Sequence, residues 1–227
     1  MYVNRAMAVG LDGALSEANW RRFEQRCDAV GVRPAFEVSP ATAVHVRTQL
    51  SARGYELDGT QSALFYALDN AGSLADPDPM FTIEPANREL LTLWQTTSVA
   101  GWSHATPEAV KASDAFARVA AVIDGDRFVV ARDKRDGRPV GCASMTVSDG
   151  IATLGGMSTV PGERGRGVQA ALIVHRLRAA VELDCRIATS TASPDGVSER
   201  NLLRHGFEQR FLLDTYVRCR AESENDD

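Results

Sequence analysis

The feature that most constrains this chain is the junction at residues 157–172, where a β-compatible run meets a long amphipathic helix through a loop of glycine and arginine. Glycines at 165 and 167 permit backbone conformations that are closed to other residues. The first N–H groups of a helix have no partner within the helix, and the helix dipole adds positive charge there. Arg164 and Arg166 add local cations. The junction therefore predicts a binding site for an anion such as a pyrophosphate.

Three interpretations of this loop compete. It can be a plain strand–helix turn with surface arginines. It can be a dinucleotide fingerprint, because Gly165-x-Gly167-x-x-Ala170 fits Gly-x-Gly-x-x-Gly/Ala, but the next strand ends in Thr189-Ser190-Thr191 without the acid that should hold a ribose. The third interpretation, a loop for the pyrophosphate of an acyl-CoA, is the one that the sequence favours.

Composition excludes several other functions. The chain has 227 residues and a net charge of -5, which argues against nucleic acid as the main partner. Its four cysteines are far apart and its four histidines are dispersed, so we expect reduced thiols and no metal centre. No run approaches the roughly 20 apolar residues that span a bilayer, and the N-terminus lacks a secretory pattern. A cytoplasmic protein without a membrane partner is expected.

Hydrophobic periodicity and turn residues predict an alternation of helices and strands. Asp149-Gly150 predicts the turn of a hairpin between strands 140–147 and 151–160. Helices are predicted at 16–30, 42–53, 87–100, 106–121, 167–183 and 197–204. Further strands are predicted at 2–11, 34–38, 81–84, 127–132, 186–191 and 207–218, with a strand or hairpin at 55–68.

The order of helix, strand, helix, Gly-aromatic and strand in residues 17–66 recurs in residues 169–218, with Gly54-Tyr55 matching Gly206-Phe207. This order predicts an internal repeat, although two unrelated halves that share a common order would look the same. A breaker-rich stretch at 69–79 predicts a linker. We therefore expect a half-domain at 1–68, a second domain at 80–220 and a disordered acidic tail at 221–227.

The segment Thr159-Val160-Pro161-Gly162-Glu163-Arg164-Gly165-Arg166-Gly167-Val168 resembles the acyl-CoA signature of GNAT N-acyltransferases. In that family a strand ending in Val-x-Pro leads through Gln/Arg-x-x-Gly-x-Gly/Ala into a helix. Two residues depart from the motif: Gly162 stands where its first Gln or Arg is expected, and Gln169 stands where Gly or Ala is usual. The resemblance covers roughly residues 80–218 and implies the family's mixed α/β fold, a central mixed sheet flanked by helices, here preceded by a partial repeat.

The resemblance also implies how acetyl-CoA would bind as cosubstrate. Pantetheine would pair with the strand formed by Met157, Ser158, Thr159 and Val160, and a backbone N–H near Met157–Thr159 would face the thioester oxygen. The amides of Arg164, Gly165, Arg166, Gly167, Val168 and Gln169 would hold the pyrophosphate. Asn201 matches a position that often contacts the CoA arm.

The acid that would protonate the departing thiolate is missing from its usual place. Many family members have a Tyr four residues before the Gly-aromatic turn, where this chain has Leu202. Candidate catalytic residues are Tyr216 and Ser198, each with a structural alternative as a packed Tyr or a solvent-facing Ser. Direct transfer with a water relay is also open.

The predicted function is transfer of an acetyl group from acetyl-CoA to a primary amine of an unidentified acceptor. A non-catalytic module that binds acyl-CoA is the alternative that Leu202 favours. The repeat predicts that residues 1–68 are a degenerate, non-catalytic half-domain, because its equivalent of the loop, Leu11–Ser16, has one glycine and carries Asp12. Whether the chain forms a homodimer is left open.

Overall fold

The computed structural model describes residues 5–11, 13–42, 44–69, 74, 76, 78–86, 90–102, 107, 110–111, 114–115, 118, 122 and 126–219. Most of the helix predicted at 106–121, most of the 69–79 linker and the 221–227 tail lie outside these residues. The chain forms two compact units, one of residues 1–62 and 211–227 and the other of Ala63–Arg210. Among the described residues, no helix is long and apolar enough to cross a membrane.

The N-terminal unit contains α1 (Glu17–Ala29), β1 (Ala35–Val38), α2 (Val44–Ala52) and the first part of β2 (Tyr55–Ala67). It also contains the end of β8 (Glu208–Arg218), whose Tyr216 lies opposite Phe36 in antiparallel register. Its core gathers apolar side chains around Trp20 and Phe36, whose ring centroids are 4.6 Å apart.

One predicted strand of this unit is reduced to a single bridge. Within the described part of the 2–11 segment, only Ala6 bridges to Phe36. The backbone then turns, because Ala8 and Gly10 have φ values of 57° and 76°. By contrast, the segment predicted as a strand or hairpin at 55–68 is one continuous strand, β2.

The second unit contains β3 (Phe81–Pro85), α3 (Leu91–Trp102), β4 (Asp126–Asp133), β5 (Pro139–Ser148), β6 (Ile151–Thr159), a 3-10 turn (Pro161–Glu163), α5 (Val168–Glu182), β7 (Ile187–Ala192) and α6 (Val197–Arg204). The β5–β6 hairpin forms as predicted, with Ser148 opposite Ile151. The strand order is β1-β8-β2-β7-β6-β5-β4-β3, and β6 pairs with β7 in parallel register.

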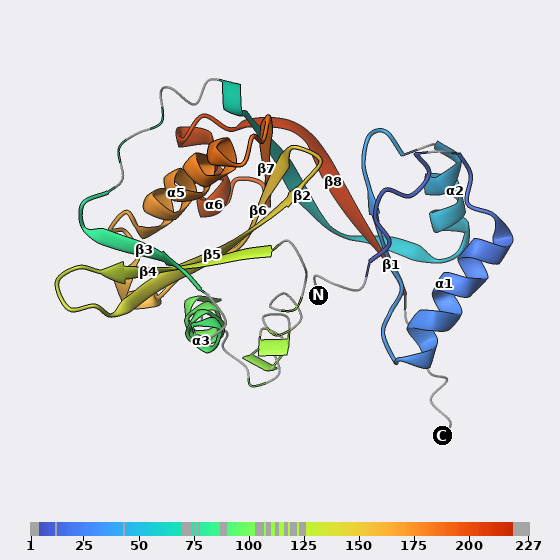
Figure 1. Ribbon diagram of the computed structural model, residues 1–227. Helices are drawn as coiled ribbons and strands as arrows, with labels where there is room; N and C mark the ends of the chain where they lie inside the picture. Colours follow the sequence, from blue (N-terminus) through green and yellow to red (C-terminus); the bar gives the residue numbers. More distant parts are fainter. Residues whose placement is uncertain are drawn as a thin grey trace. The chain divides into compact units, whose positions relative to one another are not determined.

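Two helices cover opposite faces of the β3–β6 part of the sheet (Figure 1). Side chains alternate along β4, as a strand requires. Phe128 and Val130 pack with Trp94 of α3, whereas Val129 and Ala131 pack with Val168 and other residues of α5. The β4–β6 strands are therefore buried on both sides, which fixes the strand ends that carry the predicted loop.

The order and spacing of the elements agree with the predicted repeat, which stays a prediction. When the chain is shifted so that residue 17 matches residue 169, α1 matches α5 and β1 matches β7. In the same way α2 matches α6 and β2 matches β8. The strand order adds that β1 lies beside β8 and β7 lies beside β2. Each copy's first strand thus neighbours the other copy's last strand. The compact units consequently divide the chain within β2 and β8.

Candidate functional site

The N-terminus of α5 is open in the way that the sequence predicts. Gly167, its N-cap, has a φ of 88° in the left-handed region and no side chain caps the helix. The first helical bond runs from Ala171 N–H to the Gly167 carbonyl, at 3.0 Å. A Cβ built on Gly162 or Gly165 would meet no atom within 4 Å, so the loop is open at these two residues, whereas a Cβ on Gly167 would lie 3.2 Å from Asp78 Oδ2. Exposed amides at a helix start fit a pyrophosphate.

The corresponding helix start in the other copy is closed. The N-cap of α1 is Ser16, whose hydroxyl oxygen accepts a hydrogen bond from the Asn19 N–H at 3.2 Å. A side chain therefore accepts a hydrogen bond from a first-turn N–H of α1, whereas no side chain does so at the N-cap of α5. This difference agrees with the prediction that the first copy is degenerate. That the first copy binds no ligand stays a prediction.

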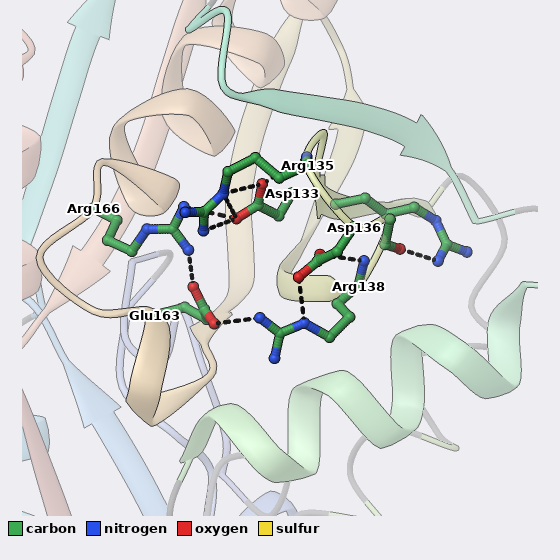
Figure 2. A network of polar contacts seen from close by, with 8 residues as sticks. Asp133, Arg135, Asp136, Arg138, Glu163 and Arg166 are labelled. Atoms are coloured by element: carbon green, nitrogen blue, oxygen red, sulfur yellow. Dashed lines mark hydrogen bonds and ion pairs between the residues drawn. The ribbon is translucent and has the colours of Figure 1, made fainter.

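The Arg166 side chain is engaged by carboxylates (Figure 2). It donates to Asp133 Oδ2 at 2.6 Å and forms an ion pair with Glu163. Glu163 also lies 3.6 Å from the guanidinium of Arg138, which in turn binds Asp136 at 2.7 Å. The sequence predicted that Arg166 adds a local cation, and in the structure these carboxylates balance its charge. Its side chain ties the loop to the β4–β5 turn, and its backbone amide remains the candidate ligand.

Asp133 is the residue of this network that the sequence did not indicate. It ends β4, its side chain has no exposed surface, and it binds both Arg135, at 2.6 Å, and Arg166. Hydrogen bonds from Arg135 above all, and then from Arg166, hold the pKa of the Asp133 carboxyl well below its usual range. The three carboxylates and three guanidinium groups that are labelled in Figure 2 balance in charge. Sequence alone shows only a charged turn there.

Arg164 is anchored in another direction. Its Nη2 donates to the Gly101 carbonyl near the end of α3, at 2.9 Å. The two arginine side chains thus attach the loop to α3 and to the β4–β5 turn. The backbone amides are therefore the remaining candidate ligands of the loop, and such a site would select an anion by shape and amide donors more than by net charge.

β6 has one unpaired edge where pantetheine is predicted to lie. Its parallel register with β7 covers only Ile151–Thr153, and Ser190 Oγ then donates to the Leu154 carbonyl at 2.9 Å. In this fully described stretch, pairing with β7 goes no further. Val160 N–H donates to the Val140 carbonyl of β5, so strand alternation directs the Thr159 N–H to the other edge. Met157 and Ser158 belong to the same open run, although the Ser158 side chain is buried.

A bulge interrupts β6 just before this run. The register with β5 shifts between Cys142, opposite Ser158, and Ser144, opposite Gly155. Gly156 has a φ of 53°, and a Cβ there would lie 2.7 Å from Ser144 Oγ, so glycine is required. Trp94 Nε1 donates to the Ala143 carbonyl at 3.0 Å from the α3 side.

From the α5 side, the bulge is held by Arg176, which sequence reasoning missed. Arg176 Nη1 donates to the carbonyls of Ser144, at 2.9 Å, and Gly155, at 3.2 Å. Its side chain is buried, with 2% exposure. A signal was present, because Arg176 falls three residues after Ile173 on the apolar stripe of the helix. A charged residue in such a stripe needs a buried partner.

Two predicted ligands of CoA are in contact. Asn201 Nδ2 of α6 donates to Gln169 Oε1 of α5 at 2.6 Å. The candidates for the acid are placed differently. Ser198 is exposed near the start of α6. Tyr216 belongs to the N-terminal unit and packs on its aromatic core. Leu202 is buried, with 1% exposure, in the core of the second unit, so no titratable group occupies the usual position.

Comparison with known proteins assigns the family. A family model described as "Acetyltransferase (GNAT) family" matches residues 87–207, more than half of the chain. The chain therefore belongs to the GNAT acetyltransferase family, a family of acyl-transferring proteins. Comparison with curated proteins gave no match.

Solved structures show the same fold at low identity. A GCN5-related N-acetyltransferase from Kribbella flavida has a TM-score of 0.66 and 17% identity, over 90% of this chain and 75% of that one. A tandem GNAT protein from the clavulanic acid biosynthesis pathway has a TM-score of 0.66 and 14% identity, over 91% and 70%. A functionally unknown conserved protein from Staphylococcus epidermidis has a TM-score of 0.63 and 11% identity, over 89% and 81%. These likenesses extend beyond the family match into the N-terminal unit.

Proposed function

We propose that this protein transfers an acetyl group from acetyl-CoA to a primary amine by direct attack. The observation that carries the proposal is the uncapped start of α5 beside the unpaired edge of β6. The amides of residues 164–169 would hold the pyrophosphate, and residues 157–160 would pair with the pantetheine arm. Gln169 and Asn201 would contact the arm near the helix start. Family membership supports acyl transfer in general.

The chemistry needs a neutral amine, a polarised thioester carbonyl and a proton for the departing thiolate. Backbone N–H groups near Met157–Thr159 would serve the second need. For the third, Ser198, Tyr216 and solvent are the possible sources. Kinetics of Ser198→Ala and Tyr216→Phe as a function of pH separate these sources. Removal of a true donor lowers kcat by about 100-fold or more, whereas a solvent proton leaves both variants near the wild-type rate.

Ligand binding tests the first step. Acetyl-CoA at 100 times its Kd adds roughly 2.7 kcal/mol to the stability of the protein that binds it. We expect CoA and acetyl-CoA to raise the thermal unfolding temperature and NAD and ATP to leave it unchanged. Stabilisation by NAD or ATP alone would reject the proposal and restore the dinucleotide interpretation of the loop.

Turnover tests the second step. We expect free CoA to be released from acetyl-CoA in the presence of at least one member of a panel of primary amines. Binding without turnover would favour a module that holds acyl-CoA, the alternative that the buried Leu202 supports. Catalysis would then be absent because the usual proton donor is absent.

A further inference from the structure

The guanidinium of Arg176 is a buried charge without a carboxylate partner. Among the residues that the structure describes, no ion pair involves Arg176. Its hydrogen bonds go to the carbonyls of Leu172, Ser144 and Gly155 and to Met157 Sδ, at 3.0, 2.9, 3.2 and 3.1 Å. Burial lowers the pKa of Arg176 to about 9, so the group stays charged at neutral pH. A lone buried charge is costly, and an apolar side chain of similar size would avoid that cost.

The Arg176 guanidinium lies against the bulge of β6. Three of its contacts lie on the two strands of the bulge, at Ser144, Gly155 and Met157. The neighbouring Cys142 thiol does not neutralise the charge, because burial raises its pKa to about 11 and keeps it protonated. Arg176 is thus a fixed cation on the α5 side of β6, at the residues where the unpaired part of that strand begins.

The hydrogen bond to Gly155 also sets the direction of the next peptide group. The C=O and N–H of a trans peptide point in opposite directions. Because the Gly155 carbonyl points to Arg176, the N–H of Gly156 points away from it, off the α5 side of the sheet. Trp94 contacts the same bulge from the other side, within 3.4 Å of a Cβ built on Gly156. The backbone of the bulge is therefore clamped between a guanidinium and an indole.

We propose that Arg176 is a positioning residue for acyl transfer, which fixes the bulge at Gly155–Met157 and, through its charge, strengthens the backbone N–H donors, from Gly156 onward, that would face the thioester oxygen. This inference rests on the proposed function, because it assumes that the thioester lies beside β6. Arg176 does not touch the substrate. It acts through the peptide groups that it polarises, in a buried region where a charge is weakly screened.

The test is the infrared stretch of the thioester carbonyl in [1-¹³C]acetyl-CoA bound to the full chain, a readout that needs no acceptor. Arg176→Gln keeps donors for the carbonyls but removes the charge, and Arg176→Lys keeps the charge. We expect the bound carbonyl to absorb at higher wavenumber in Arg176→Gln than in wild type, and Arg176→Lys to stay close to wild type. With a reactive amine, Arg176→Gln should lower kcat about tenfold or more while KM for acetyl-CoA stays within about threefold.

A purely structural role has a different signature. Leu177→Ala removes a fully buried side chain on α5, next to Arg176, and serves as the destabilised control. It should lower Tm without moving the carbonyl band. An unchanged band in Arg176→Gln with acetyl-CoA still bound, or equal band shifts in Arg176→Gln and Leu177→Ala, overturns the inference and leaves the proposed function standing. If Arg176→Gln does not fold, a shifted band in Arg176→Lys overturns it. Failure of the wild type to bind acetyl-CoA rejects the proposed function itself.

Discussion

Asn201 Nδ2 donates a hydrogen bond to Gln169 Oε1 across the start of α5, at 2.6 Å. The bond links the first turn of α5 to α6, and it fixes the amide of Gln169 beside the uncapped N–H groups. Gln169 stands where the family's loop usually has a small residue. In the other copy, the shift of the repeat places Glu17 at this position. The two predicted copies therefore differ in charge at this position, as they do at Asp12 and Arg164.

Gln169→Glu should weaken CoA binding while the fold stays intact. The substitution is isosteric, and a carboxylate oxygen still accepts from Asn201. A negative charge in the first turn stabilises a helix by about 0.3–1 kcal/mol. The same charge repels a pyrophosphate, which should raise the Kd for CoA about tenfold or more. Calorimetry measures the affinity. Asn19→Asp, the same change at an exposed position of α1, is the control and should leave the Kd unchanged. An unaltered Kd in Gln169→Glu would show that the pyrophosphate does not bind at the start of α5.

Asp133→Asn should loosen the loop without touching the ligand. Asp133 holds both Arg135 and Arg166, so loss of its charge removes the main anchor of the Arg166 side chain. We expect the Kd for CoA to rise roughly tenfold, because the loop is no longer held in one shape. Asp136→Asn lies in the same turn but contacts Arg138, and should have little effect. Equal Kd values for the two variants would show that the network does not shape the loop.

The acid stability of the protein should depend on Asp133. Its pKa is depressed in the folded state, chiefly by hydrogen bonds from Arg135 and then from Arg166. A depressed carboxyl pKa adds stability that is present above the unfolded pKa, about 3.9, and is lost as pH falls through the folded value. Between about pH 5 and pH 2, the Tm of the wild-type protein should therefore fall by more than the Tm of Asp133→Asn does. Parallel curves of Tm against pH for the two proteins would contradict the role of this carboxylate.

Leu64→Ala should destabilise the second unit although Leu64 precedes the predicted linker. Leu64 is fully buried on β2, in the core that also contains Ile173 and Leu202. The substitution should cost about 2–5 kcal/mol in urea unfolding. Leu57→Ala on the same strand removes an exposed side chain and should cost about 0.5 kcal/mol or less. Similar unfolding midpoints for the two variants would show that β2 contributes little to that core.

The sequence predicted the features that depend on local chemistry. The uncapped loop followed from Gly165 and Gly167 at a strand–helix junction, and the β5–β6 hairpin followed from Asp149-Gly150. Features set by contacts between distant residues were not predictable. Arg166 and Asp133 are 33 residues apart, and no pattern within the loop shows that its arginine is already paired. The bulge likewise depends on Arg176, 21 residues after Gly155.

The same distinction explains the division of the chain. Composition marks 69–79 as a breaker-rich stretch, but strand pairing decides which residues form one core. β2 and β8 each run from one compact unit into the other, and no local signal reveals that. The 1–68 and 80–220 domains remain a prediction, which limited proteolysis in the 69–79 stretch tests. An independently stable, monomeric 1–68 fragment would contradict it.

The crossing of β2 and β8 has a consequence for how such a chain can change over generations. A duplicated half normally becomes dispensable once its own site has decayed. Here, under the predicted repeat, the last strand of each copy lies beside the first strand of the other copy. Deleting residues 1–68 would remove β2 from beside β7, so selection for an intact fold of the second unit would preserve the N-terminal half whether or not that half binds a ligand.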